Sequence, residues 1–454
     1  MEETAAIDNA SARAPGIDIA EFINQARIGP FQLLVFAQCV LVSMLDGFAT
    51  QSIAFVAPAI AADWKIAPAS FGPIFSATAL GSIVGAMLGG PLADRFGRKI
   101  VMVLSVAIFA GVSLATIYAG SVHSLVVMRL LTGLGLGAAL PNLISLATEY
   151  APQRRRSTIV AITLWGFPLG AALGGAVSAH LIAQFGWSTV FLLSGIVSLL
   201  FLPILMFRLP ESIMYLALRS GTRGAIVAIL ARIDPTYRLD PASSVVLPER
   251  VVAGNTLGAI FRGPLAAATL LLSVAMLASL SVTYCVLNWI PSLLHQEGLP
   301  IQDAVMGTVI FNFSGILGSY FLTRLADRGS PLPLMASVYV LGALSVAMIG
   351  VGGASFWRVM VATFFAGLFI IGSQLSITAF VSSYYPTAVR GTAIGWSIGF
   401  GRFGQILGPL AGGFALAMGV QPRGFFQLLS VPVLIAASAL YALFRILRKR
   451  GNAR

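Results

Sequence analysis

The sequence predicts an all-α polytopic membrane protein with twelve transmembrane helices in two pseudo-symmetric six-helix bundles. Hydrophobic residues make up 57% of the 454 residues and charged residues only 10%, with a mean hydropathy of +0.91. Many apolar runs reach about 20 residues, the length that crosses a hydrocarbon core of about 30 Å at about 1.5 Å per helical residue. A short charged motif also occurs twice, once in each half of the chain. Length, apolarity and repetition together favour this fold class.

The apolar runs come as six, then a polar stretch, then six more. We expect a cytoplasmic tail at 1–28, a first bundle at 29–209, a cytoplasmic linker at 210–263, a second bundle at 264–447 and a second tail at 448–454. The linker is rich in arginine and proline, which is typical of a connection with short helices and not of a separate catalytic domain. The predicted spans are 31–60, 71–93, 100–119, 123–148, 158–184, 187–209, 264–290, 302–325, 331–351, 356–383, 390–417 and 424–446.

The repeated motif indicates an internal duplication. Residues 90–99 read GPLADRFGRK, and residues 323–329 read TRLADRG. The similarity continues through later helices at an offset of 234, where proline, arginine and glycine positions recur. Parallel repeats of this kind place a substrate site at the interface of the two halves and permit rocking between outward and inward states. The further pairs are Pro152 with Pro386, Arg156 with Arg390, Thr158 with Thr392, Gly170 with Gly404, and Gly174 with Gly408.

The net charge of +12 follows the predicted topology. Lys and Arg gather in every second connection, from Arg95 after helix two to Arg445 after helix twelve, whereas the opposite connections hold only Lys65, Arg358 and Arg423. Cytoplasmic loops retain basic residues, so we expect a multi-pass protein of the bacterial inner membrane with both termini in the cytoplasm. Residues 1–28 lack a basic n-region, which argues against a cleaved signal peptide. No nucleic acid partner is needed to explain the charge.

Several stretches resemble a known family. GPLADRFGRK is similar to the signature of the major facilitator superfamily, and the resemblance covers residues 28–447. Within that superfamily, LDGFATQSIAFVAPAI at 45–60, RLLTGLGLGAALPNLISLATEY at 129–150 and YPTAVRGTAIGWSIGFGRFGQILGP at 385–409 resemble the aromatic acid:proton symporters. The resemblance implies the major facilitator fold and transport of an aromatic acid such as 4-hydroxybenzoate, benzoate or protocatechuate. The segment at 209–221 is similar to several branches, including sugar carriers.

The chain departs from these symporters in its first helix. They usually carry two aspartates in a pattern of the form DGFD, whereas this chain keeps Asp46 and has Ala49 at the second position. Positions 46 and 49 are one helical turn apart, so we expect both to face the same cavity. The loss of one carboxylate affects proton stoichiometry, coupling or substrate range.

Three charged residues lie deep in the spans: Asp46, Arg129 and Arg402. A charge that faced lipid would cost about 2.5–3.5 kcal/mol, so each should face a wet cavity or another charge. A guanidinium matches a carboxylate with two hydrogen bonds, and the resemblance places substrate-binding arginines at these two positions. We expect Arg129 and Arg402 to bind an anion and Asp46 to carry a proton. The alternative is that these groups pair permanently and hold helices together.

Aromatic and amide side chains could complete a pocket for an aromatic ring. Apolar walls with a few placed polar groups suit such a ligand, because the ring stacks while its carboxylate is held at one end. Helix packing is the alternative explanation for each of these residues. The predicted substrate-binding set, besides the two arginines, is Gln51, Asn142, Trp165, Tyr284, Asn288, Asn312, Gln374 and Phe403, with Phe48, Phe167, Trp289 and Trp396 as further candidates.

Charged residues at the cytoplasmic helix ends are predicted to gate transport. Glu149 lies near the arginines after helix four and near the LADR motif, and a latch among these groups would stabilise the outward-open state and separate on inward opening. The alternative is that they serve only as orientation signals. The predicted gating residues are Asp94, Arg95, Arg98 and Glu149 in the first half, and Asp327, Arg328 and Arg390 in the second.

Other chemistry finds little support. Cys39 and Cys285 both fall inside predicted spans, where they suit packing better than a disulfide, and the three histidines are isolated, so we expect no metal and no cofactor. GLGLG at 133–137 lies within a helix and lacks the preceding strand of a nucleotide-binding loop. We therefore expect a monomeric carrier, not an enzyme, that imports a small organic anion with protons. Carriers of another organic acid, sugar or drug, and a transport-dead ligand sensor, remain alternatives.

Overall fold

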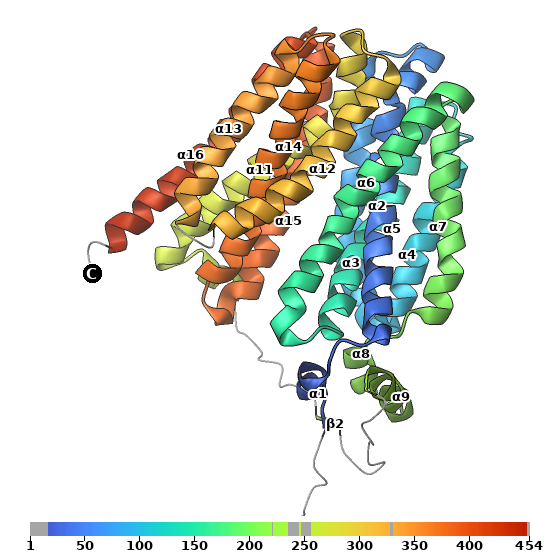
Figure 1. Cartoon of the computed structure of the whole chain (residues 1–454), viewed down its shortest axis with the longest axis vertical. Coiled ribbons are helices and arrows are strands. Elements are labelled where there is room, and N and C mark those ends of the chain that lie inside the picture. The colour runs from blue at the N-terminus through green and yellow to red at the C-terminus, as the bar shows by residue number, and fades with distance from the viewer. Residues whose placement is uncertain (1–16, 220, 235–244, 247–255, 327–329, 452–454) are drawn as a thin grey trace, which may run out of the picture.

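The computed structural model of the chain describes residues 17–219, 221–234, 245–246, 256–326 and 330–451. Six long helices form the N-terminal bundle and six more form the C-terminal bundle (Figure 1). The N-terminal bundle consists of α2 Pro30–Trp64, α3 Phe71–Phe96, α4 Arg98–Thr116, α5 Val122–Glu149, α6 Arg156–Phe185 and α7 Ser188–Arg208. The C-terminal bundle consists of α11 Gly263–Gln296, α12 Ile301–Ala326, α13 Pro331–Val351, α14 Phe356–Tyr384, α15 Thr387–Ala417 and α16 Pro422–Gly451.

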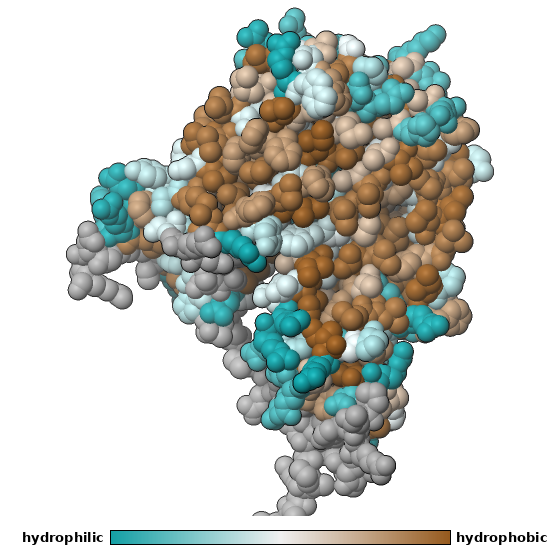
Figure 2. All heavy atoms as spheres, viewed as in Figure 1, coloured by the Kyte–Doolittle hydropathy of each residue, from teal (hydrophilic) through white to brown (hydrophobic). Residues whose placement is uncertain are grey.

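Eleven helices in the described residues are long and apolar enough to cross a membrane. The long helix outside this set is α15. It is a continuous helix of 31 residues, but the polar residues Arg402 and Gln405 near its middle interrupt its apolar run. Figure 2 shows apolar side chains in a broad belt over both bundles, with hydrophilic side chains gathered at the two ends. The predicted all-helical membrane fold is confirmed, since each predicted span overlaps one long helix.

Short elements connect or precede the bundles. They are α1 Ile19–Gln25, α8 Ile213–Ala217, α9 Arg223–Ile233 and α10 Thr256–Ile260, the 3-10 turns η1 Pro68–Ser70 and η2 Gln153–Arg155, and the strands β1 Ile17–Asp18 and β2 Val245–Val246. The two strands pair in parallel. The helices α1, α8 and α9 lie together at one end of the N-terminal bundle (Figure 1), which we call the linker end, and the opposite end is the far end.

The linker-end helices are attached to the N-terminal bundle by apolar and polar contacts. Ile19 and Ile23 of α1 and Ile226 of α9 are buried in one cluster with the apolar core of that bundle. The Arg232 guanidinium lies 4.2 Å from the centre of the Phe31 ring at the start of α2. The stretch that follows the sixth long helix is therefore partly folded against the N-terminal half.

Small residues bring helices of each bundle into close contact. Gly85 of α3 lies against the backbone carbonyl of Leu134 in α5, so closely that a Cβ would not fit. Gly318 of α12 lies in the same way against Leu368 of α14. These glycines are 233 positions apart and the leucines 234, close to the spacings of the sequence repeat. Close approach through small residues is the usual way in which membrane helices gain packing energy, and here it recurs in both halves.

The two bundles contact each other mainly toward the far end. The Ser76 hydroxyl on α3 donates a hydrogen bond to the Ile406 carbonyl on α15 at 2.8 Å. The Phe75 ring meets the Trp289 ring edge to face, with centroids 5.2 Å apart. Trp289 is fully buried and donates to the Pro409 carbonyl at 3.1 Å, so it packs between the halves instead of anchoring a helix in the membrane interface. Figure 1 shows the bundles diverging toward the linker end.

Candidate functional site

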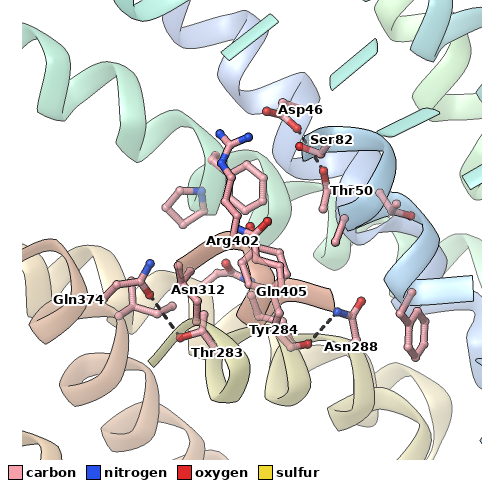
Figure 3. A pocket seen from close by; sticks show the side chains of 18 of the residues that line it. Asp46, Thr50, Ser82, Thr283, Tyr284, Asn288, Asn312, Gln374, Arg402 and Gln405 are labelled. Carbon is pink, nitrogen blue, oxygen red and sulfur yellow. Dashed lines mark hydrogen bonds between the residues drawn. The ribbon is translucent and has the colours of Figure 1, made fainter. Parts of the chain in front are cut away.

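A cavity of about 250 Å³ lies between the two bundles. It is lined by α2, α3, α5 and α6 from one half and by α11, α12, α14 and α15 from the other. Its wall holds one carboxylate, Asp46, and one guanidinium, Arg402. Figure 3 shows these two groups with the surrounding amides and hydroxyls. Both halves therefore contribute to one binding-sized space, as internal duplication predicts.

Asp46 lies on α2 and is 6% exposed. The Thr50 hydroxyl, one turn further along the same helix, donates to its Oδ1 at 3.1 Å. Ala49 is fully buried and packs in the apolar core of the N-terminal bundle. The expectation that positions 46 and 49 share the cavity does not fit this structure, because Ala49 packs into that core and is not among the cavity-lining residues.

Arg402 lies near the middle of α15, in the half of the cavity opposite α2. Its Nη1 is buried and has no hydrogen-bond partner in the described part of the chain. Gln405 follows three residues later and lines the same cavity. A buried guanidinium N–H without an acceptor costs free energy, so the site suits a ligand that supplies an anionic oxygen.

Amide side chains of the C-terminal bundle line the rest of the polar wall. Gln374 on α14 accepts through Oε1 from the Thr283 hydroxyl on α11 at 3.3 Å. Asn288 donates through Nδ2 to the Tyr284 carbonyl at 2.7 Å, and Asn312 on α12 donates to the Thr308 carbonyl at 3.0 Å. Each amide is thus oriented by one hydrogen bond, and all of them are cavity residues (Figure 3).

Arg129 does not line this cavity. It is fully buried in α5, where its Nη2 donates to the Thr116 hydroxyl on α4 at 2.9 Å. Its guanidinium lies 4.8 Å from the centre of the Phe191 ring on α7. The side chain is therefore held inside the N-terminal bundle, between α4, α5 and α7, and is separate from the space that contains Arg402.

Four other predicted binding residues also lie outside the cavity lining. Asn142 donates to the Ala138 carbonyl of its own helix at 2.8 Å, and Gln51 is fully buried on α2. Trp165 lies on α6 but does not line the cavity. The Phe403 side chain is 51% exposed, next to Arg402 but on the outer face of α15. The structure thus brings together Asp46, Arg402, Tyr284, Asn288, Asn312 and Gln374 of the predicted set.

Sequence reasoning missed several polar residues of the cavity wall. Thr50 and Gln405 follow Asp46 and Arg402 by four and three positions, so helical spacing from the buried charges could have indicated both. Ser82 on α3 and Thr283 on α11 carry no charge and no motif, and nothing in the sequence distinguishes them from other small polar residues in a span.

The predicted gating residues of the first half lie at the linker end. Arg98, at the start of α4, forms an ion pair with Glu149, at the end of α5. The other Glu149 oxygen accepts from the Ser212 hydroxyl at 2.6 Å. Asp94 is exposed, and the Arg95 carbonyl accepts from Arg219. These contacts tie the α3–α4 turn and α5 to the segment after α7 within one half.

The second set of predicted gating residues is only partly described. Arg390 donates through Nε to the Tyr385 carbonyl at 3.2 Å at the start of α15. Asp327 and Arg328 lie outside the described residues. No group of three or more His, Cys, Asp or Glu side chains that could hold a metal occurs in the described ranges, and Cys39 and Cys285 are buried free thiols.

The sequence profile of the Major Facilitator Superfamily matches residues 39–409. The chain belongs to this superfamily. It is 38% identical over 428 residues to a 4-hydroxybenzoate transporter of Pseudomonas aeruginosa, covering 94% of this chain and 95% of that one. It is 36% identical to a gallate transporter of Pseudomonas putida, with coverage of 94% and 95%. These relatives place it among the aromatic acid transporters of the Major Facilitator Superfamily.

Solved structures agree on the fold. The crystal structure of a D-xylose-proton symporter superposes with a TM-score of 0.69 at 17% identity, covering 90% of this chain and 97% of that one. A further sequence relative, a 3-(3-hydroxy-phenyl)propionate transporter of Escherichia coli, is 34% identical, with coverage of 90% of this chain and 94% of that one. As a Major Facilitator Superfamily member, the chain is a membrane-embedded carrier of a small organic substrate and not an enzyme.

Proposed function

We propose that the chain imports a small aromatic carboxylate, such as 4-hydroxybenzoate, benzoate or protocatechuate, together with protons by alternating access. The observation that carries this proposal is the buried Nη1 of Arg402, which has no acceptor in the described part of the chain and lies in a cavity that both halves line. The wall offers one cation and a surface that is mostly apolar, which suits one carboxylate on an apolar body. Relatives that transport 4-hydroxybenzoate and gallate support the same substrate class.

The walls of the cavity suit an aromatic ring. Phe75, Phe167, Leu287 and Ile371 present apolar surface from four different helices around the polar groups. A ring that stacks against such walls buries its faces, while its carboxylate takes two hydrogen bonds from Arg402. Gln374 lines the same space, where its amide lies within hydrogen-bond distance of the Thr283 hydroxyl.

Asp46 is the proposed proton carrier. It is the carboxylate in the cavity wall, and it faces the half that supplies the substrate arginine. A carboxyl group that loses a proton when the cavity opens to one side, and gains one when it opens to the other, couples transport to the proton gradient. Only one such group lines the described cavity, so we infer that the cycle uses Asp46 without help from position 49.

The proposal also includes the orientation of the chain in the membrane and the gating residues at the linker end. We infer that the linker end lies in the cytoplasm, because it carries Arg95, Lys99 and Arg154–Arg156. The bundles diverge at that end and meet toward the far end, so the structure corresponds to an inward-facing state on this orientation. We further propose that the network of Asp94, Arg95, Arg98 and Glu149 engages the second half, with Arg390 and the undescribed Asp327 and Arg328, only when the linker end closes.

Uptake into proteoliposomes tests the proposal. The purified protein is reconstituted, and labelled 4-hydroxybenzoate, benzoate and protocatechuate are added with and without an inward proton gradient, beside aliphatic acids and sugars. We expect accumulation of at least one aromatic acid that depends on the gradient. Saturable binding without accumulation would instead indicate a ligand sensor, and uptake of only an aliphatic acid or a sugar would refute the substrate class.

A further inference from the structure

The central cavity is polar at two levels, and the two levels differ in hydrogen-bonding character. Helix contacts place Arg402 at one level and Asn288 and Asn312 at the other. The free group at the first level is a donor, because Nη1 of Arg402 has no acceptor among the described residues. The second level is different, because both asparagines use their nitrogens.

The asparagine side chains are fixed with their oxygens free to accept. Asn288 donates to the carbonyl four residues earlier in α11, and Asn312 does the same in α12. An amide whose nitrogen donates to the backbone turns its Oδ1 to the other side. No donor to either Oδ1 is found among the described residues, and both residues line the cavity, where Figure 3 shows the Asn288 oxygen turned away from the Tyr284 carbonyl.

Helix contacts place the two levels apart along the cavity. Gly401, next to Arg402 on α15, packs against Leu280 of α11. Farther along α15, the Pro409 carbonyl accepts a hydrogen bond from Trp289, the neighbour of Asn288 on α11. Asn288 therefore lies about seven residues beyond Arg402 toward the far end, or about 10 Å along the helix axis. Gly307 of α12 packs against Ile290 and Leu294, which brings Asn312 to nearly the same level as Asn288.

We propose that Asn288 and Asn312 are specificity-determining residues that accept a hydrogen bond from a ring hydroxyl remote from the substrate carboxylate. This inference rests on the proposed function, since Arg402 holds the carboxylate at the other level. A benzoate with a para hydroxyl has a carboxylate that accepts at one end and a hydroxyl that can donate at the other, which complements the free donor and the free acceptors of the cavity. Its length with a hydrogen bond at each end is comparable to the separation of the two levels.

The chemistry predicts which acids the carrier prefers. A para or para-and-meta hydroxylated benzoate places a donor at the asparagines. Benzoate leaves both amide oxygens without a donor, and 4-methoxybenzoate presents an acceptor to an acceptor, so both lose affinity. 2-Hydroxybenzoate carries its hydroxyl beside the carboxylate, where it cannot reach the asparagines. We expect 4-hydroxybenzoate to compete at least about ten-fold more strongly than the other three acids.

Competition in proteoliposomes that contain the full chain tests the inference. Labelled 4-hydroxybenzoate uptake is inhibited by each of the four acids in the wild type and in Asn288→Leu and Asn312→Leu. We expect both variants to lose the preference, with a ratio of 4-hydroxybenzoate to benzoate affinity that falls about ten-fold while benzoate affinity is kept. Retained benzoate recognition shows that the variant is folded. Asn142→Leu is the matched control, because Asn142 makes the same bond to its own helix outside the cavity, and its ratio should equal that of the wild type.

The outcomes separate this inference from the function on which it rests. Transport of all four acids with equal affinity would overturn the role of the asparagines and leave aromatic acid transport standing. The same holds if Asn288→Leu and Asn312→Leu keep the wild-type ratio, or if both lose benzoate and 4-hydroxybenzoate in equal proportion. If neither these four acids nor protocatechuate are transported or bound, the proposed function is refuted and this inference with it.

Discussion

Arg402 offers the substrate a charge and a fixed geometry, and the two contributions can be separated. Arg402→Gln removes both, so we expect uptake of the aromatic acid to fall below detection. Arg402→Lys keeps the charge but loses the planar pair of donors, and KM should rise by about ten-fold or more. Arg358→Gln removes an equal charge from an exposed position at the far end and should leave uptake unchanged. An Arg402→Gln carrier with wild-type KM would show that the anion binds elsewhere.

Asp46 can be tested apart from substrate binding because exchange needs no net proton movement. In Asp46→Asn the side chain cannot titrate, so we expect loss of gradient-driven accumulation while counterflow exchange of preloaded substrate continues. Asp63→Asn makes the same change at an exposed position of the same helix, and both activities should persist there. Equal loss of accumulation and exchange in Asp46→Asn would assign the carboxylate a binding or structural role.

Sequence reasoning at the residue scale could locate charges but not the direction in which they point. An ionisable side chain deep in a span needs water or a partner, and this argument drew attention to Asp46, Arg402 and Arg129 alike. Arg129 donates through Nη2 to Thr116 and lies over the Phe191 ring, inside one bundle and outside the cavity, although its Nε and Nη1 have no partner among the described residues. That difference depends on helix rotation, which packing against neighbouring helices sets. The same reason explains why Ala49 lies away from the cavity although Asp46 faces it.

Gly97 joins α3 to α4 in a conformation that glycine adopts and other residues rarely do. Its φ is +103°, and a Cβ there would collide with the carboxylate of Glu211, whose Oε1 accepts from the Lys99 amide at 3.0 Å. We expect Gly97→Ala to cost about 1–3 kcal/mol of stability, from backbone strain and displacement of Glu211. A thermal unfolding assay in detergent should give a Tm several degrees below wild type.

A glycine of the same motif provides the control for that change. Gly90 lies within α3, and a Cβ there meets no atom within 4 Å, so Gly90→Ala should leave Tm unchanged or slightly raised. Equal Tm values for Gly97→Ala and the wild type would show that the turn tolerates a side chain. The contact of Gly97 with Glu211 comes from a segment more than one hundred residues away, which no local sequence pattern reveals.

The helices themselves were predictable because a span must satisfy its own backbone hydrogen bonds within lipid. Apolar length therefore located all twelve, including α15 with its central arginine. The short elements α1, α8 and α9 were harder to foresee, since their order depends on contacts with the N-terminal bundle, such as those of Ile23 and Ile226. Hydropathy describes a relation to lipid and carries little information on elements that pack at a bundle end.

At the scale of the whole molecule, the two halves are held together toward the far end by close backbone contact. A Cβ on Gly413 of α15 would lie 3.0 Å from the Gly72 Cα of α3, and the neighbouring hydrogen bond from Ser76 needs the same approach. A larger side chain at position 413 should separate the halves at this end, because the backbone of a packed helix cannot yield locally. The equilibrium would then move toward the state that is open at the far end.

Distances between spin labels can report that shift. Tyr118→Cys, after α4, and Trp357→Cys, at the start of α14, place labels on exposed positions of the two halves at the far end, in a chain with Cys39→Ser and Cys285→Ser. Gly413→Leu should lengthen the label distance and lower transport, since a carrier held open on one side cannot complete the cycle. Gly399→Leu, on the same helix where a Cβ meets no atom within 4 Å, should keep the original distribution. An unchanged distribution in Gly413→Leu would mean that this glycine contact does not control closure.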